Sequence, residues 1–143
     1  MNTKTLLAAI VGGIVSFLLG YVVFGMLLMS YYEAHEVAYE GMVKASPNLI
    51  TLFIANVAFA YLIAIVIEWS NMPGIMKGAV IGAVIGLLVT LSMDLFFYSL
   101  LNYYNDFMII VVDVVMNIIF YAIIGGIIGY MMGMGKKVEV ATA

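Results

Sequence analysis

The sequence contains no cysteine and no arginine, and only 9% of its 143 residues are charged. Without cysteine the chain can form no disulfide, no zinc–thiolate centre and no thiol nucleophile. The formal net charge of −3 provides no basic surface, which argues against binding to nucleic acid. A soluble domain carries about 25% charged residues, so the shortage of charge indicates that much of this chain does not face water.

Apolar residues take the place of the missing charges. They make up 66% of the chain, and the mean hydropathy is +1.21. Four apolar segments, about 5–30, 47–68, 74–101 and 107–134, can cross a hydrocarbon layer of about 30 Å, which takes about 20 helical residues. The sequence therefore predicts an all-α protein, a four-helix transmembrane bundle in a single domain over 1–143. The first segment runs to about Met29, which favours an uncleaved helix over the alternative, a signal peptide.

Lysines set the expected orientation of the four segments. Lys4, Lys77, Lys136 and Lys137 fall on one side of the bundle, and only Lys44 falls on the other. Lysine and arginine are enriched in cytoplasmic loops of membrane proteins. We therefore expect a multi-pass protein with both termini in the cytoplasm, N-in and C-in.

Small residues recur at every fourth position in three of the segments. Such rows allow two helix backbones to approach closely, which is the main packing device between helices in lipid. All three rows lie in the cytoplasmic half, so we expect the bundle to be tightest there and more open and polar towards the outside. The helix-packing glycines are Gly12, Gly20, Gly74, Gly78, Gly82, Gly86, Gly125, Gly129 and Gly133.

Two aspartates, Asp94 and Asp113, lie in the last two segments at similar distances from the short turn between them. Each is about eight residues from the turn, or about 12 Å below the outer tip of the hairpin. A carboxylate at this depth normally faces the bundle interior or a water-filled cavity. Two carboxylates that approach each other share a proton or hold a cation between them. Other side chains expected to bind the ion or ligand are Asn56, Thr90, Tyr98, Asn117 and Tyr121.

Two other interpretations of the aspartates stay open. A protonated aspartate can simply hydrogen-bond to Asn or Thr across a helix interface, where such bonds contribute about 0.6 kcal/mol on average. An aspartyl protease pair is a more remote alternative, because the flanking "SMD" and "VVD" lack a glycine-rich approach such as GxGD. No complete catalytic constellation is present, so we expect no enzyme activity and no cofactor.

The outer loop contains a stretch, residues 33–45, with small or apolar residues at helical spacing and acidic residues opposite. This pattern predicts an amphipathic helix lying at the outer membrane interface. Glu33, His35, Glu36 and Glu40 are residue types that bind metals. Their spacing matches no metal motif such as HExxH, so they are weak candidates for a metal site.

The stretches "GGIVSFLLGYVVFGMLL", "SMDLFFYSL" and "VDVVMNIIFYAIIGGIIGYMMG" resemble small four-span bacterial membrane proteins of unknown function, of the kind found in Bacteroidetes-type genomes. The resemblance covers nearly the whole chain. It implies a four-helix fold and a location in the bacterial inner membrane, and it implies no activity and no site residues.

Together these patterns favour a small carrier. We expect the aspartate pair to bind or translocate a proton, a cation or a small polar ligand from a polar layer that is open to the outer side. The alternative is a non-catalytic accessory or assembly protein that docks through its glycine rows. The expected partners are the lipid bilayer and either a second copy of the chain or another membrane protein.

Overall fold

The structure, a computed structural model, describes residues 2–71 and 73–134. Lys136 and Lys137, which contribute to the expected orientation, lie outside this range. Within the described residues, five α-helices and one π-helical turn follow one another. They are α1 (Thr3–Val22), the π-turn η1 (Val23–Leu27), α2 (Met29–His35), α3 (Leu49–Trp69), α4 (Ile75–Leu100) and α5 (Met108–Gly133).

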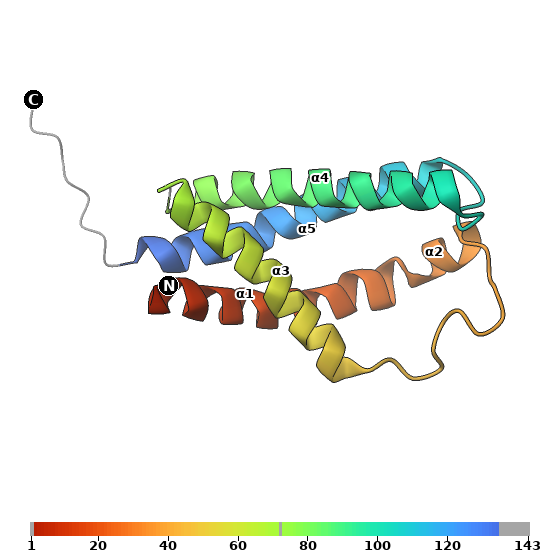
Figure 1. Cartoon of the computed structure of the whole chain (residues 1–143), viewed down its shortest axis with the longest axis horizontal. Helices are drawn as coiled ribbons and strands as arrows, with labels where there is room; N and C mark the ends of the chain where they lie inside the picture. Colours follow the sequence, from red (N-terminus) through yellow and green to blue (C-terminus); the bar gives the residue numbers. More distant parts are fainter. Residues whose placement is uncertain (1, 72, 135–143) are drawn as a thin grey trace, which may run out of the picture.

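Four of these helical stretches are long and apolar enough to cross a membrane: Thr3–Leu27, Leu49–Trp69, Ile75–Leu100 and Met108–Gly133. The prediction of an all-α, four-helix bundle is thereby confirmed, and the chain is a multi-pass membrane protein by length and composition. Figure 1 shows the start of α1 and the end of α5 at one end of the bundle. The turn between α4 and α5 lies at the other end, beside α2. The first of these ends is called the terminal end below, and the second the hairpin end.

The helices α4 and α5 pack backbone against backbone. A Cβ atom added to Gly78 would lie 2.2 Å from the carbonyl oxygen of Gly125, and one added to Gly82 would lie 2.0 Å from that of Tyr121. Towards the hairpin end, a Cβ on Gly86 would meet the Tyr121 ring at 2.8 Å. No side chain larger than hydrogen fits at these positions without moving a helix. The glycine rows of the two helices therefore face each other within the chain.

The other glycines of the predicted rows have more varied surroundings. A Cβ on Gly129 would lie 2.3 Å from the Gly74 carbonyl oxygen, whereas one on Gly12 would meet side chains, those of Ile128 at 2.7 Å and Ala60 at 3.4 Å. Gly20 and Gly133 have ordinary space around them, with nearest atoms at 3.6 Å. Gly74 has a φ of 134° and precedes the first turn of α4, so its role is a backbone conformation that L-residues rarely adopt.

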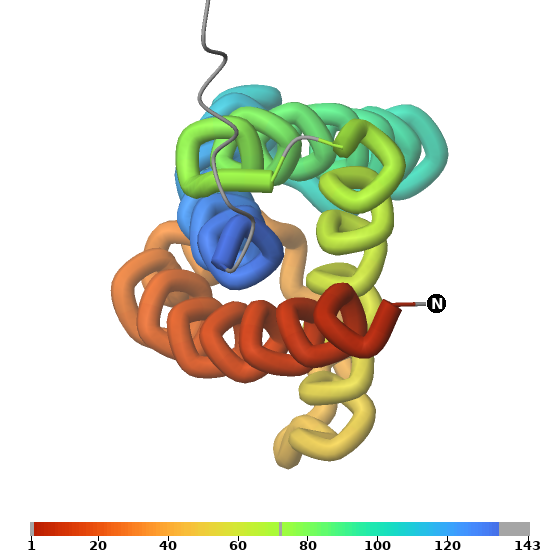
Figure 2. The backbone as a smooth tube through the Cα atoms, turned by 90° about the vertical axis from the view of Figure 1, so that its left-hand side faces the viewer, coloured from red at the N-terminus to blue at the C-terminus, as the bar shows by residue number. Residues whose placement is uncertain are grey.

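The helix α5 also packs against α1 and α3 to form the apolar core. Figure 2 shows α5 between α4 and α1, with α3 crossing α1 on one side. The N-terminal half of α3 leads away from α4 and α5 in both views (Figures 1 and 2). The fully buried side chains of this core include Ala8, Ala9, Ala60, Ile63, Ala64, Ile67, Ile124 and Ile128.

The outer loop corrects one prediction. The chain is helical only to His35, and residues 36–48 have turns and irregular backbone instead of the amphipathic helix expected over 33–45. Two features of the backbone are incompatible with a helix over 36–45. The Val37 N–H pairs with the Tyr103 carbonyl oxygen at 2.8 Å, which draws the chain into an extended conformation. Gly41 has a φ of 77°, in the left-handed region.

Candidate functional site

The α4–α5 hairpin brings Asp94 and Asp113 to the same depth. Asp94 lies six residues before the end of α4 at Leu100, and Asp113 lies five residues after the start of α5 at Met108. At 1.5 Å per residue they are about 9 Å and about 8 Å from the helix ends. The close glycine contact holds the helices together just below this level. The two carboxyl groups are close enough to interact electrostatically.

The pair is buried under two tyrosine hydroxyls. The Asp94 side chain is 5% exposed, and its Oδ1 accepts a hydrogen bond of 3.0 Å from the Tyr104 hydroxyl. Asp113 is half-buried, and its Oδ1 accepts a short hydrogen bond from the Tyr32 hydroxyl. The other oxygen of Asp94, Oδ2, is buried and has no donor among the described residues. We call these four side chains the aspartate–tyrosine site.

Two segments of chain form a lid over the site: residues 29–37, which contain α2, and residues 101–107, which join α4 to α5. They pair as a short antiparallel bridge between Glu36 and Tyr104. Two backbone hydrogen bonds of 2.8 Å hold this bridge, from Val37 N–H to the Tyr103 carbonyl and from Asn105 N–H to the His35 carbonyl. The pairing places Tyr32 and Tyr104 over the aspartates. The layer that the sequence predicted to be open is covered in this structure.

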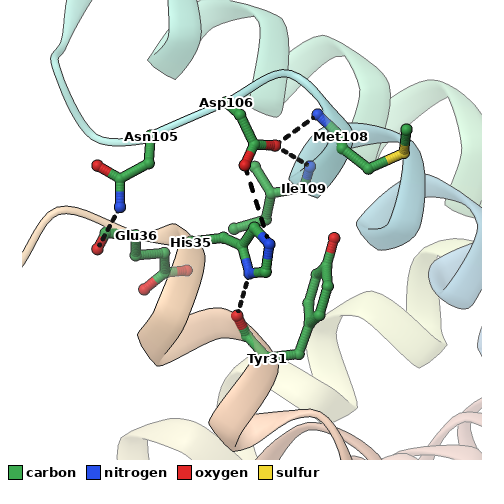
Figure 3. A network of polar contacts seen from close by, with 7 residues as sticks. All are labelled: Tyr31, His35, Glu36, Asn105, Asp106, Met108 and Ile109. Carbon is green, nitrogen blue, oxygen red and sulfur yellow. Dashed lines mark hydrogen bonds and ion pairs between the residues drawn. The ribbon is translucent and has the colours of Figure 1, made fainter.

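Side chains also fasten the lid, as Figure 3 shows. The Asn105 amide donates to the Glu36 carbonyl oxygen at 3.3 Å. His35 Nδ1 lies 2.8 Å from the Tyr31 carbonyl oxygen, and its Nε2 lies 3.9 Å from Asp106 Oδ2. A carbonyl oxygen can only accept, so Nδ1 carries a hydrogen. Protonated His35 also carries a hydrogen on Nε2, and in this form the ring pairs with Asp106 and connects the two segments of the lid.

Asp106 has a second role at the start of α5. Its Oδ1 accepts hydrogen bonds from the backbone N–H groups of Met108, at 2.8 Å, and Ile109, at 3.3 Å (Figure 3). These are donors of the first helical turn, which have no partner within the helix. The same carboxylate therefore caps α5 and faces His35, which ties the lid to the helix that carries Asp113.

The lid tyrosines stay protonated and can act as hydrogen-bond donors. Burial raises the pKa of Tyr103 to about 12, and its contact with the Glu36 carboxylate adds to the rise. Burial also raises the pKa of Tyr32, and its hydrogen bond to Asp113 raises it further. The pKa of Tyr104 is raised by burial and then by the charge of Asp94. All three hydroxyls keep their hydrogens at neutral pH and offer them to carboxylates.

Among the five other residues predicted for the site, two lie near the pair. The Asn117 amide donates to the Asp113 backbone carbonyl at 3.0 Å, one helical turn below the carboxyl group. Tyr121 lies one turn deeper, and its ring stacks on Phe59 with the centroids 4.3 Å apart. These two residues form the floor of the site on α5.

The remaining three contribute elsewhere. Asn56 accepts a hydrogen bond of 2.6 Å from the Ser16 hydroxyl, so it joins α3 to α1. The outward course of α3 takes it away from the aspartates. Tyr98 is 46% exposed and packs on Phe107. Thr90 is half-buried and makes no hydrogen bond to the pair within the described part of the chain.

The weak metal candidates of the outer loop do not converge. Within residues 2–71 and 73–134, no group of three or more His, Asp or Glu side chains is placed to hold a metal ion. Instead, His35 and Glu36 belong to the lid, while Glu33 and Glu40 are exposed.

Tyr32 and Tyr104 are not among the residues that the sequence predicts for the site, although both donate to its aspartates. The position of Tyr104 follows from the hairpin, because it lies in the turn ten residues after Asp94. The position of Tyr32 follows from the bridge between distant segments and from the turn η1, which has no signature in the sequence.

Comparison of this chain with protein-family models, with curated proteins and with solved structures finds no match. The fold and the site geometry therefore carry the functional argument, and the resemblance to small bacterial four-span proteins stays a prediction.

Proposed function

We propose that this protein is a small carrier that binds a proton or a cation at the Asp94–Asp113 pair and exchanges it with the outer side of the membrane. In this proposal the hairpin end faces outward and both termini are cytoplasmic, in a bacterial inner membrane. The protein acts by binding and release, without catalysis. A second copy of the chain completes the pathway, because one bundle of four helices rarely encloses a conduit.

One observation carries the proposal: a buried carboxylate oxygen, Asp94 Oδ2, has no donor among the described residues and lies beside a second carboxyl group. Two neighbouring carboxylates in a medium of low dielectric repel each other strongly, and both cannot be ionised at low cost. A positive ligand between them removes this cost. Ionisable groups inside membrane helices are expensive and mark ion pathways and proton relays.

Exchange of the ion with the outer side requires the lid to move. The bridge that holds the lid in place is weak enough to allow this movement. Two backbone hydrogen bonds hold the bridge, and each contributes only about 0.5–1.5 kcal/mol net. The turn η1 connects the lid to α1, and π-helical turns are frequent at functional sites. Lifting residues 29–37 would remove the Tyr32 hydroxyl from Asp113 and uncover the pair.

The competing proposal, an accessory protein that docks through its glycine rows, has less support. The glycines of α4 and α5 already face each other, with carbonyl oxygens 2.0–2.3 Å from where a Cβ would be. Gly78, Gly82, Gly125 and Gly129 are therefore used for packing inside the chain and are not free to contact a partner.

The test is ion flux in proteoliposomes. The purified chain is reconstituted, and the internal pH is followed with a trapped dye while a potassium diffusion potential drives proton entry. A trapped sodium indicator follows sodium in parallel. We expect flux of one of these ions in the native chain and its loss in the double variant Asp94→Asn/Asp113→Asn.

A matched control is Glu40→Gln, which removes one carboxylate from the exposed outer loop. It should leave flux unchanged. Equal flux in the native chain and the double variant, with both folded by circular dichroism, would refute the proposal. Absence of flux in the native chain would refute transport of these two ions.

A further inference from the structure

We propose that the ligand of the aspartate–tyrosine site is a single proton, carried on Asp94 Oδ2 and donated to Asp113, and that no metal cation replaces it. This inference rests on the site of the proposed function and names its ligand. It concerns the protonation of the site, so it can be tested without measuring transport.

The first argument is space. Asp94 Oδ2 has no surface that water can reach. A sodium or magnesium ion that bound this oxygen would require an open position beside it, and magnesium also keeps several of its waters. A proton shared between two carboxyl groups needs no additional volume. The closed site therefore accommodates a proton and excludes a hydrated ion.

The second argument is the count of donors and acceptors. Tyr104 donates to Asp94 Oδ1, and Tyr32 donates to Asp113 Oδ1. With both carboxyl groups ionised, Asp94 Oδ2 is an acceptor with no donor in the described chain and faces a like charge. One added proton on Asp94 Oδ2 provides the missing donor and a hydrogen bond to Asp113. A second proton, on Asp113, would make this group a weaker acceptor for both Tyr32 and Asp94, so the singly protonated pair satisfies the site best.

The third argument is charge. The groups that act on Asp94 are Asp113 and Tyr104, and those that act on Asp113 are Asp94, Tyr32 and Asn117. None of these groups carries a positive charge. Lys77 lies 17 residues before Asp94 on α4, about 26 Å away along the helix. Since no described lysine or histidine neutralises the pair, the proton must do so.

The proton belongs on Asp94 rather than on Asp113 because their environments differ. Asp94 is 5% exposed, whereas Asp113 is only half-buried. Asp113 also receives the short Tyr32 bond and lies above the Asn117 amide, and donors of this kind favour an ionised carboxylate.

The test is infrared spectroscopy of the full chain in lipid nanodiscs. A protonated carboxyl group has a carbonyl stretch that is resolved from ionised carboxylates and from the amide bands. At neutral pH we expect one such band per chain. It should be lost in Asp94→Asn, where the amide donates to Asp113 as the acid did. It should persist, shifted, in Asp113→Asn, and Glu40→Gln should leave it unchanged.

Saturating sodium or magnesium chloride should not alter the band, because the proton has no metal competitor. A native chain without the band at neutral pH would overturn the inference, and so would a band that either salt removes. A band that survives Asp94→Asn would place the proton elsewhere and also overturn it. If the band behaves as expected but no flux occurs, the proposed transport fails and the proton site stands. If sodium flux occurs and the band is missing, the proton site fails and the proposed transport stands.

Discussion

Two adjacent glycines on α5 provide a sharp test of the packing that holds the site together. A Cβ on Gly125 would lie 2.2 Å from the Gly78 carbonyl oxygen and 2.9 Å from the Gly82 Cα. A Cβ on the next residue, Gly126, would have its nearest neighbour at 3.6 Å, which is ordinary contact. Alanine at Gly125 must therefore displace a helix backbone, and alanine at Gly126 need not.

The size of the effect follows from the geometry. To reach ordinary contact at 3.4 Å, the Cβ at position 125 must retreat by 1.2 Å from the Gly78 oxygen (3.4 − 2.2). A gap of about 1 Å forfeits up to about half of the dispersion energy of each contact along the interface. Overpacking of a tight core costs about 1–3 kcal/mol. We expect Gly125→Ala to lose about 3 kcal/mol of unfolding free energy, roughly a hundredfold in the equilibrium constant at about 1.4 kcal/mol per tenfold.

The assay is equilibrium unfolding in mixed micelles, with helix content followed by circular dichroism while the denaturing detergent is increased. Gly126→Ala is the control, because it adds the same methyl group one residue away, and it should stay within about 0.5 kcal/mol of the native chain. The reasoning is refuted if the two variants unfold at the same detergent fraction. It is also refuted if Gly126→Ala is the less stable of the two.

Three further outcomes are expected. Tyr32→Phe leaves the half-buried Asp113 Oδ1 without its hydroxyl donor and should lower stability by about 1–3 kcal/mol; an unchanged unfolding midpoint would mean that the lid does not close on the pair. The pKa of Tyr103 is raised from 10.0 to about 12 by burial and the Glu36 carboxylate, so its stabilising contribution is complete below pH 10 and is lost as the pH rises through 12. The step of tyrosinate absorbance near pH 12 should be smaller by one tyrosine in Tyr103→Phe, and a titration identical to the native one would contradict this. Asn48→Ala removes the acceptor for the Ile50 and Thr51 N–H groups at the start of α3 and should cost about 1 kcal/mol; Asn48→Asp, which keeps the acceptor, should not.

The fold could be predicted because the length of an apolar segment determines whether it can cross a membrane as a helix. A backbone with no water to bond must be helical across the membrane, and about 20 apolar residues suffice. The equal depth of Asp94 and Asp113 was predictable for a related reason, since a short turn forces two helices to run antiparallel with matched rise. Neither inference required knowledge of side-chain contacts.

The residues that make up the site were harder to predict from the sequence, because they are brought together by tertiary contacts. Asn56 shares the polar character of the site residues, but α3 crosses α1 obliquely and takes it to Ser16. The stretch 33–45 has helical periodicity, yet pairing of the Val37 N–H with the Tyr103 carbonyl ends the helix at His35. In both cases a contact between segments distant in sequence determined the local structure. Such a contact cannot be predicted from the periodicity of a single segment.

The turn η1 has a consequence for how this chain tolerates insertions and deletions. Its closing bond runs from Leu28 N–H to the Val23 carbonyl oxygen, 2.9 Å and five residues back, so the turn holds one residue more than an α-helical turn. One residue rotates the direction of all later side chains by about 100°. Tyr32 follows this turn and reaches Asp113 in the register that the extra residue sets. Deleting one residue from Val23–Leu27 would leave a continuous apolar helix and point the hydroxyl away from the pair. The position of Tyr32 over the site thus depends on the one additional residue in η1, because this residue sets the direction of the side chains that follow it.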